Sequence, residues 1–432
     1  MASVLTLRTA QHDGISMAPS VSQHRSGPPI AFLSPSANLG GAERVLLDTI
    51  AGLRAADVSQ RIAVFCTGEG ELTNELSALG VSVSIHPFPV ELASLGDARV
   101  RPTRSGFGVA ARAVIAGPTA LRYALGLRST LRTFAPEVIH SNGAKMHLLA
   151  AIASRGVAPV VWHLHDYVSS RPFMRKALQA SVGTCAAIVA NSESVAADAR
   201  AVLGDGANIH AVLNGVDLTR FKVSGPTLSL DEVARTSPAP GGTIRVGLVG
   251  TFAKWKGHEL FFRALATIDA RLPIRAYVIG GALYETIGSQ YSMAELVRMA
   301  DSFGLNGRVM FTGLLADAPT AMRSLDIVVH ASTAPEPFGL VIAEAMACGK
   351  AVITSGSGGS LELVDDERDA LVVPSGDANG LGSAVVRLAS DAELRARLGT
   401  AARATAVQRF DRNRMAHSLT QIHRQVARSP RR

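Results

Sequence analysis

Two carboxylates stand eight positions apart in the stretch PEPFGLVIAEAMACGKAVITS, residues 335–355. Glu336 precedes Pro337, and a residue before proline is kept out of the helical conformation, so Glu336 is expected in a loop. Glu344 lies about a turn and a half inside the helix that the apolar run predicts. Acids at such different depths do not form the closely facing acid–base pair of glycosidases. Separate roles for the two side chains are therefore expected.

The start of that helix is the strongest ligand-binding signal in the sequence. Phe338, Gly339 and Leu340 are expected to begin the helix, where free backbone N–H groups and the helix dipole favour a phosphate. Glu336 would then touch a group on the near side of the phosphate. Glu344 would lie further along and accept hydrogen bonds from vicinal hydroxyls, such as those of a ribose. The stretch thus predicts a site for a ligand that carries both a phosphate and a diol.

Two other segments carry residues that could meet the same phosphate. Gly40 and Gly41 precede a predicted helix, and small residues let backbone N–H groups approach an anion. A plain turn is the commoner meaning of such a pair, and the GxGxxG dinucleotide fingerprint is not present. Lys254 and Lys256 follow a predicted strand, where they could offset the charge that grows on a phosphate leaving group. A solvent-facing lysine pair is the alternative.

Histidines end another predicted strand, PVVWHLHD at 159–166. Alternation along the strand points His163 and His165 to one face and Trp162 to the other. No third ligand with clear spacing follows, so a metal site is not expected. A histidine that hydrogen-bonds a substrate hydroxyl and a histidine satisfied inside the structure are equally compatible with the pattern.

The elements that must position these residues form two series of parallel α/β units. Short runs rich in Val and Ile alternate with helical patterns, as expected for sheets covered on both faces. The first series of strands is predicted at 28–35, 61–68, 81–88, 137–143, 159–166, 186–192 and 209–217. The second is predicted at 243–252, 274–282, 308–315, 326–333, 350–357 and 369–376. Ligands of such sheets lie beyond the carboxyl ends of the strands, here in a cleft between two doubly wound domains.

The domain boundaries follow from composition. The predicted organisation is a disordered leader at 1–26, a first Rossmann-like domain at 27–220, a linker at 221–242, a second Rossmann-like domain at 243–405, and a helix with a basic tail at 406–432 that returns to the first domain. The 432 residues and the 47% hydrophobic content fit a folded two-domain protein.

Cysteine usage and hydropathy bear on the compartment. Cys66, Cys185 and Cys348 have no CxxC spacing and sit among small or apolar residues, so buried free thiols in a reducing cytoplasm are expected. Neither a secretory apolar region nor a run of about 18 apolar residues is present, so no cleaved signal and no membrane span are expected.

An arginine-rich segment stands out at 99–132, where the chain has seven arginines and no acidic residue. Apolar side chains are interleaved with the arginines, which is typical of an element that lies on a membrane surface. The alternative is a pair of helices that pack on their own domain with a solvated arginine face. The net charge of +8 fits phosphate or anionic lipid as partners.

The residues described above resemble the retaining glycosyltransferases of the GT-B fold, family four in the usual sequence classification, also called group 1. The resemblance runs from about residue 28 to about residue 420. Its most specific part is the pair of glutamates separated by seven residues, with PFG between them and a glycine pair after the next strand. The other matching pieces are GGAERVLLDTIAGL, EVIHSN, HDY, IVANSESVA, VLNGVDLTRF, VGTFAKWKGH, RVMFTG and LVVPSGD.

The resemblance implies a role for each matching residue. Glu344 would hold the ribose hydroxyls of a sugar nucleotide, and Glu336 would lie beside the transferred sugar. The backbone N–H groups of Phe338, Gly339 and Leu340 would lie near the sugar and the diphosphate. The family usually needs no metal, so no cofactor is expected beside the nucleoside-diphosphate sugar.

Residues outside the glutamate stretch complete the implied site. Lys256 would bind the diphosphate, Gly41 would close on it from the other domain, and His165 would lie beside the reacting sugar and acceptor. One departure is Thr251, which stands where the family commonly has an arginine. Either Lys254 substitutes for that arginine or the donor site is weakened.

The function implied is transfer of a sugar from a nucleoside diphosphate to an acceptor hydroxyl, with retention, in polysaccharide, glycolipid or other glycoconjugate synthesis. A catalytically silent partner subunit, motivated by Thr251, and an epimerase-like enzyme are the alternatives. The acceptor would be a sugar, a lipid-linked compound or a small molecule, and no nucleic acid is expected as a partner. The expected location is the cytoplasm, with the segment 99–132 making peripheral contact with the inner face of the membrane.

Overall fold

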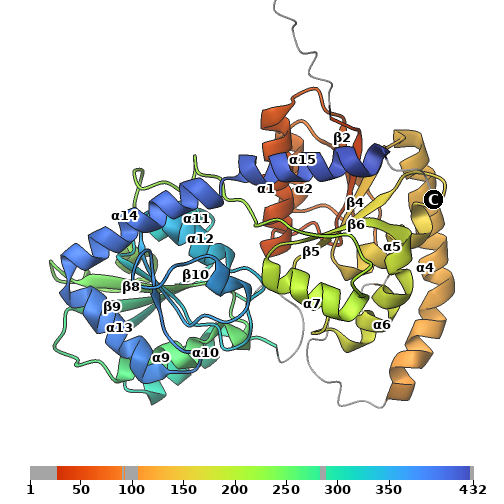
Figure 1. The fold of residues 1–432 in the computed structure, drawn as a ribbon. Helices are drawn as coiled ribbons and strands as arrows, with labels where there is room; N and C mark the ends of the chain where they lie inside the picture. The colour runs from red at the N-terminus through yellow and green to blue at the C-terminus, as the bar shows by residue number, and fades with distance from the viewer. Residues whose placement is uncertain (1–26, 90–91, 93–105, 283–288, 429–432) are drawn as a thin grey trace, which may run out of the picture.

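A computed structural model describes residues 27–89, 92, 106–282 and 289–428 of the chain (Figure 1). The predicted leader at 1–26, the part of the arginine-rich segment at 99–105 and the last residues of the tail at 429–432 lie outside the described residues. The rest forms two α/β domains, and the prediction of two parallel strand series is confirmed.

The first domain is built on a seven-stranded parallel sheet in the order β3-β2-β1-β4-β5-β6-β7. Its strands are β1 (Ile30–Leu33), β2 (Ile62–Cys66), β3 (Ser82–Ile85), β4 (Val138–Asn142), β5 (Val160–Leu164), β6 (Cys185–Ala190) and β7 (Ile209–Ala211). Its helices are α1 (Gly41–Ala56), α2 (Glu71–Ala78), α4 (Gly106–Phe134), α5 (Ala144–Ala153), α6 (Pro172–Ser181) and α7 (Glu193–Leu203), with a short 3-10 turn η1 (Val182–Thr184). Neighbouring residues of β5 pack into clusters on opposite faces, Trp162 on one and Val161 on the other, which is why the strand is apolar except for His163.

The second domain is built on a six-stranded parallel sheet in the order β10-β9-β8-β11-β12-β13. Its strands are β8 (Ile244–Val249), β9 (Ile274–Ile279), β10 (Val309–Gly313), β11 (Ile327–His330), β12 (Ala351–Thr354) and β13 (Leu371–Val372). Its helices are α8 (Leu230–Val233), α9 (His258–Ala266), α10 (Met293–Ser302), α11 (Ala318–Arg323), α12 (Leu340–Ala347), α13 (Ala378–Ser390) and α14 (Ala392–Arg409), with 3-10 turns η2 (Lys254–Lys256) and η3 (Gly359–Glu362).

The segment 221–242, which composition marks as a linker, is packed on the second domain. Asp231 of α8 is buried and accepts hydrogen bonds from the Tyr277 hydroxyl at 2.7 Å and from Arg275 at 2.8 Å. Phe221 joins the core of the same domain. The serine and proline content of this segment therefore did not reveal that it packs on the second domain through buried hydrogen bonds and apolar contacts.

The chain passes between the domains twice at one place. Val216 on the first passage donates to the carbonyl of Phe410 on the second, and Arg412 donates back to the carbonyl of Val216. A side chain at Gly215 would lie 2.4 Å from the backbone of Arg412, so only glycine allows this approach. The two passages form one narrow junction.

Beyond that junction, α15 (Arg412–Arg428) packs against α1 on the first domain (Figure 1). The returning helix begins at Arg412, and residues 406–409 still belong to α14. The predicted helix start at 406 was therefore too early, because the chain breaks at Phe410 to cross the junction. Met415 and Leu419 pack with Val45 in the first domain.

The three cysteines differ in burial. Cys66 and Cys348 are buried free thiols, as predicted, whereas Cys185 is only half-buried at the start of β6.

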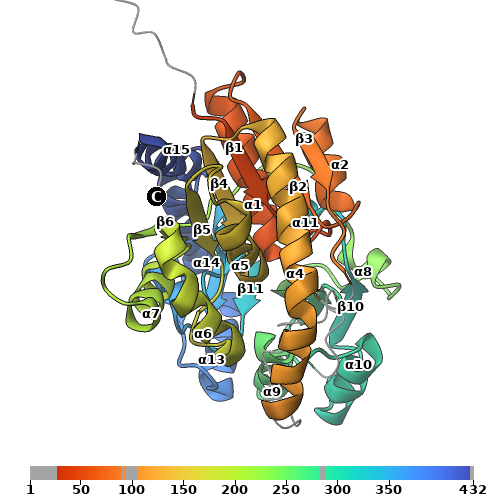
Figure 2. The ribbon, with the colours of Figure 1, turned by 90° about the vertical axis from the view of Figure 1, so that its right-hand side faces the viewer.

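The part of the arginine-rich segment that is described forms the single long helix α4 at the outer edge of the first domain, rather than a pair of helices (Figures 1 and 2). In the described part of the chain, none of the helices combines the length and the apolar character that crossing a bilayer requires.

Candidate active site

Glu336 lies at the centre of a buried hydrogen-bond cluster in the loop between β11 and α12. Its Oε2 accepts hydrogen bonds from Lys256 Nζ at 2.8 Å and Ser332 Oγ at 3.0 Å, and His330 Nε2 lies 3.3 Å away. Burial alone would raise the pKa of Glu336, but the Lys256 ammonium and the His330 contact outweigh it and hold the pKa well below its usual range. Glu336 is therefore an ionised carboxylate at neutral pH.

Lys256 reaches Glu336 from the short turn η2 after β8. The next residue, Gly257, has φ 78°, and a Cβ there would lie 1.7 Å from the carbonyl oxygen of Ala331. Only glycine allows the turn to pack so closely on the end of β11. Lys256 Nζ also lies 4.1 Å from the centre of the Trp255 ring, which adds a cation–π contact. Together these contacts hold the ammonium at the carboxylate.

Glu344 occupies a different environment on α12. It is half-buried, and the described residues place no hydrogen-bond donor on its carboxyl group. Burial raises the pKa of Glu344 to about 8; Asp48 adds to the rise, while Arg44 and Arg220 oppose it. Asp48 and Arg44 belong to α1, so this acid faces the first domain. Glu344 is a neutral acid at pH 7 with unused hydrogen-bonding capacity.

The helix start between the two acids differs slightly from its prediction. α12 begins at Leu340, and Gly339 precedes it with φ 96° in the left-handed region, so the helix does not extend back to Phe338. Phe338 is buried, with its ring centre 6.1 Å from that of Phe410. The Phe338 side chain belongs to the core, and only its backbone could serve a ligand. The first N–H groups of α12 have no partners within the helix, as an anion site requires.

Gly41 is the exposed first residue of α1. A Cβ at Gly41 would meet no atom within 4 Å, whereas one at Gly40 would lie 2.8 Å from the Glu43 carboxylate. No contact inside the protein therefore requires glycine at position 41, and the space beside it is open. The start of α1 has no side-chain cap from Gly40, but the Glu43 carboxylate accepts hydrogen bonds from the backbone N–H groups of Gly40 and Glu43.

The two lysines of the second domain point to different places. Lys254 is exposed, and its Nζ lies 5.5 Å from the centre of the Tyr291 ring, beside α10. Lys256 is the lysine that contacts Glu336. Thr251 is half-buried in the loop between β8 and these lysines. The interpretation that Lys254 substitutes for an arginine at Thr251 stays a prediction.

His165 lies just beyond β5 in the first domain. Its Nε2 is 3.0 Å from Asn142 Oδ1, and an amide oxygen only accepts, so Nε2 carries the proton. Its Nδ1 is buried and has no partner among the described residues. Burial lowers the pKa of His165 to about 4, so the ring is neutral at pH 7. A neutral ring with a bare Nδ1 can accept a hydrogen bond from a substrate hydroxyl.

A chain of buried histidines supports His165 from behind. His140 Nδ1 lies 2.9 Å from Nε2 of His423 on α15, and His140 Nε2 lies 3.1 Å from His163 Nδ1. The ring centres of His163 and His165 are 4.2 Å apart. Burial lowers the pKa of His140, His163 and His423, so each ring has one N–H. The C-terminal helix is therefore linked through the first sheet to the His165 ring. Sequence reasoning identified His163 and missed the other two.

Several further side chains of the site were missed from the sequence. His330 ends β11, Asn142 ends β4, and Tyr167 follows β5, where its hydroxyl reaches the backbone carbonyl of Glu336 at 3.2 Å. Each lies at the carboxyl end of a parallel strand, where ligands of such sheets bind. That position was the available signal, although polar residues at strand ends are too common for it to be specific.

Two family models match the chain. The model of family 4 glycosyltransferases matches residues 39–220, and the model of group 1 glycosyl transferases matches residues 231–405. The two matches correspond to the two sheets described above and cover most of the chain.

Curated relatives carry related names. The chain is 28% identical over 205 residues to the lipopolysaccharide core biosynthesis glycosyltransferase LpsE of Rhizobium meliloti, covering 48% of this chain and 56% of that protein. It is 30% identical over 248 residues to the D-inositol 3-phosphate glycosyltransferase of Xylanimonas cellulosilytica, covering 56% and 57% respectively. The chain thus spans about half the length of the curated relatives that it matches.

Solved structures are similar over nearly the whole chain. Anabaena Alr3699/HepE, solved in complex with UDP-glucose, has a TM-score of 0.74 and 26% identity, covering 92% of this chain and all of that one. A glycosyltransferase from Rickettsia africae has a TM-score of 0.74 at 18% identity, covering 94% of this chain, and shows the shared fold. With its two facing Rossmann-like domains and both family matches, the chain belongs to the group 1, or family 4, glycosyltransferases of the GT-B fold.

Proposed function

We propose that this glycosyltransferase moves a sugar, with retention of anomeric configuration, from a nucleoside-diphosphate sugar to an acceptor hydroxyl. The observation that carries the proposal is the ion pair between half-buried Lys256 and buried Glu336, whose Nζ and Oε2 atoms lie 2.8 Å apart beyond the carboxyl ends of β8 and β11. A fixed ammonium at this place can offset charge on a departing diphosphate. The similarity to Anabaena Alr3699/HepE, which binds UDP-glucose, supports a nucleotide sugar as the donor.

The proposed donor would contact both domains. Glu344 would hold the ribose hydroxyls, and the start of α12, from Phe338 to Leu340, would receive the sugar and the diphosphate through backbone N–H groups. Lys256 would bind the diphosphate from the second domain, and Gly41 would approach it from the first. The open space at Gly41 and the unused hydrogen-bonding capacity of Glu344 support these roles.

The chemical step then needs few protein groups. The bond from the anomeric carbon to the diphosphate oxygen breaks, and the acceptor oxygen bonds to the same face of that carbon. The departing diphosphate takes the acceptor proton. His165 would orient the acceptor hydroxyl and Glu336 would hold the sugar. Lys256 stabilises the developing negative charge, which is the main catalytic contribution.

We propose a sugar, lipid-linked or small-molecule acceptor and a place in glycoconjugate synthesis. Relatives named for lipopolysaccharide core biosynthesis and for inositol phosphate glycosylation support this class of acceptors. The proposed diphosphate site relies on Lys256 and on a helix start, so EDTA should leave transfer unchanged. Loss of transfer in EDTA that added Mg²⁺ or Mn²⁺ restores would contradict this part of the proposal.

The donor can be identified by a thermal-shift screen across UDP-, GDP- and ADP-sugars. A specific donor stabilises the folded protein by mass action, so one nucleotide should raise the melting temperature far more than the others. The same donor should be hydrolysed slowly without acceptor, and Glu336→Ala should abolish this hydrolysis. A protein that binds donors without hydrolysing them would instead support a silent partner subunit. A protein that neither binds nor hydrolyses any of them would overturn the proposal.

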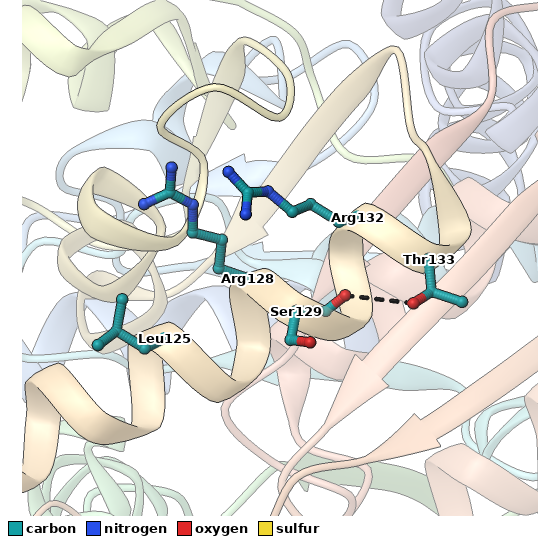
Figure 3. A pocket seen from close by; sticks show the side chains of 5 residues that line it. All are labelled: Leu125, Arg128, Ser129, Arg132 and Thr133. Carbon is teal, nitrogen blue, oxygen red and sulfur yellow. Dashed lines mark hydrogen bonds between the residues drawn. The ribbon is translucent and has the colours of Figure 1, made fainter.

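We also propose that α4 brings the enzyme to the cytoplasmic face of a membrane. Arg128 and Arg132 line an open hollow of about 520 Å³ on this helix, and their guanidinium groups lie on the same side of it (Figure 3). Neither forms an ion pair with any acidic residue that the structure describes. Leu121 and Leu125 are 48% exposed on the same helix. Unpaired arginines beside exposed leucines fit anionic lipid headgroups above an apolar layer.

Liposome flotation tests this contact. The full chain should float with vesicles that contain phosphatidylserine or phosphatidylglycerol at low salt, and not with neutral vesicles. Arg128→Gln with Arg132→Gln should reduce flotation several-fold. The matched control, Arg395→Gln with Arg397→Gln on α14 of the other domain, should not. Equal flotation of the two variants, or no flotation at low salt, would sink the proposal.

A further inference from the structure

We propose that Tyr167 and Glu362 are positioning residues that latch the two domains together and fix the distance between His165 and Glu336. Both lie outside the groups assigned above to the donor or the acceptor. The Tyr167 hydroxyl, on the first domain, bonds backbone groups of the second domain and Ser194 of α7. The Glu362 carboxylate, on η3 of the second domain, bonds backbone N–H groups at the start of α7 in the first. The kinetic part of the inference rests on the proposed function.

The Tyr167 hydroxyl uses its full hydrogen-bonding capacity at the domain boundary. It donates to the backbone carbonyl of Glu336 at 3.2 Å and accepts from the backbone N–H of Gly359 at 3.2 Å. Ser194 Oγ lies 3.0 Å away on the first domain and occupies the remaining position. One donor and two lone pairs are thus all engaged. Because Tyr167 follows His165 by two residues, this hydroxyl ties the acceptor side directly to the loop of Glu336.

The glycine pair after β12 is shaped by the first domain. Gly358 has φ 72°, and a Cβ there would lie 2.2 Å from the Tyr167 hydroxyl oxygen. A Cβ at Gly359 would lie 2.7 Å from Ser192 Oγ and 2.0 Å from the backbone carbonyl of Pro337. Side chains of the first domain therefore occupy the space that any larger residue would need. The SGSGGS loop is built for close contact between the domains.

Glu362 forms a second contact at the start of α7. Its two carboxylate oxygens accept from the backbone N–H groups of Glu193 at 2.8 Å and Ser194 at 2.6 Å. Ser192 caps the same helix by accepting from Val195 at 3.1 Å. The N–H groups at a helix start otherwise have only water as a partner, and a carboxylate there also meets the positive end of the dipole. The contact is charge-assisted, yet water can replace it when the domains part.

The two contacts together explain how the cleft can close without a ligand bridging it. The Glu336 side chain is fixed by Lys256 inside the second domain, while its backbone carbonyl is fixed by Tyr167 of the first. Loss of the latch leaves the fold of each domain and the proposed donor contacts within the second domain intact. It lowers the fraction of molecules in which His165 and Glu336 stand at working distance.

The test uses Tyr167→Phe and Glu362→Gln with matched controls. Tyr123→Phe removes a hydroxyl that donates to the His86 carbonyl at 2.9 Å within the first domain. Glu295→Gln changes a carboxylate that accepts the Ser292 N–H at 2.6 Å within the second domain. Each pair loses the same kind of bond, so a general loss of stability should affect control and variant alike.

Two readouts separate the latch from a structural role. Spin labels at Asn74→Cys and Ala294→Cys, in a Cys185→Ser background, report the distance between the domains without any substrate. The distribution should broaden in Tyr167→Phe and Glu362→Gln and stay narrow in the controls. In transfer assays the two variants should lose about tenfold in kcat, with the donor dissociation constant within about threefold of wild type. The controls should keep kcat within about twofold.

Unchanged distances in both variants would overturn the inference, as would kcat values equal to those of the controls. A chain that transfers no sugar would refute the proposed function and still leave the distance measurement to decide on the latch. A narrow distribution of spin-label distances in wild type and a broad one in Tyr167→Phe would then support the latch without any activity measurement.

Discussion

The loop that carries Glu336 and the helix that carries Glu344 shift the pKa of a glutamate carboxyl group in opposite directions. Both acids are withdrawn from water, which by itself raises a carboxyl pKa. At Glu336 the Lys256 ammonium and His330 reverse that effect, and the pKa falls well below its usual range. At Glu344 no such partner is in place, Asp48 adds to the rise, and the pKa reaches about 8.

The difference lies in which domain supplies the neighbouring charges. Glu336 is charged by Lys256 and His330 of its own domain, so its state is set before any ligand or partner domain arrives. Asp48 and Arg44, which act on Glu344, lie on α1 of the other domain. The electrostatic state of Glu344 therefore depends on how the domains meet. One acid is held as an anion by its own domain, and the other keeps its proton in an environment that both domains form.

Among the variants that test this difference between the two acids, Glu336→Gln should have the largest effect on activity. The amide keeps the shape and removes the charge, so Lys256 and His330 lose the anion that orients them. Transfer or donor hydrolysis should fall by about 100-fold or more, as when a preorganised charge contact is lost in other active sites. Steady-state rates at saturating donor measure this. A variant that keeps more than half of the wild-type rate would show that the ionised state of Glu336 is unimportant.

Lys256→Ala should come next, with a loss of roughly 30- to 100-fold in kcat/KM, because the departing diphosphate loses its fixed positive charge. Lys254→Ala is the matched control, since its ammonium lies over Tyr291 and away from Glu336. Its kcat/KM should stay within about twofold of wild type. Equal losses in the two variants would instead support Lys254 as the substitute for an arginine at Thr251.

Replacing Glu344 by Ala or by Gln should affect nucleotide binding differently. Glu344→Ala removes the proposed hydrogen bonds to the ribose and should weaken nucleotide binding by about tenfold. Glu344→Gln resembles the protonated acid and should bind within about threefold of wild type at pH 7. Isothermal titration with the nucleoside diphosphate and its 2′-deoxy form tests both. A Gln variant as weak as the Ala variant would mean that the bound state needs the carboxylate.

The smallest expected effect is on stability against pH. An acid whose folded pKa is raised stabilises the fold below its unfolded pKa, and this contribution is lost as pH rises through about 8. Between pH 5 and pH 8.5 the unfolding free energy of wild type should therefore fall relative to Glu344→Gln. The difference is on the order of 1 kcal/mol, because solvent screens a half-buried group. Urea unfolding at several pH values measures it, and parallel curves would contradict the raised pKa.

The positions of the strands, and the loop and helix that carry the two glutamates, could be predicted from local sequence patterns. All thirteen described strands lie in or within one residue of the predicted segments. Most of them are rich in apolar residues because both faces of the sheet are covered, whereas the edge strand β3, with the sequence SVSI, is exposed at both ends. Pro337 placed Glu336 in a loop and Glu344 in a helix, since the restriction before proline acts within one residue. The helix start at Leu340 was missed by two residues because Gly339 adopts a left-handed conformation.

The sequence by itself determined the two sheets, the family, and the separation of the two acids into loop and helix. Only the tertiary structure decided their charges and the contacts between the domains. Tyr167 and Glu336 are 169 positions apart, and His140 and His423 are 283 apart, yet both pairs are in hydrogen-bond contact. Local propensities act over a few residues, whereas burial and Coulomb interactions act through space. The pKa of each acid and the contacts between the domains therefore depend on residues that no local pattern connects.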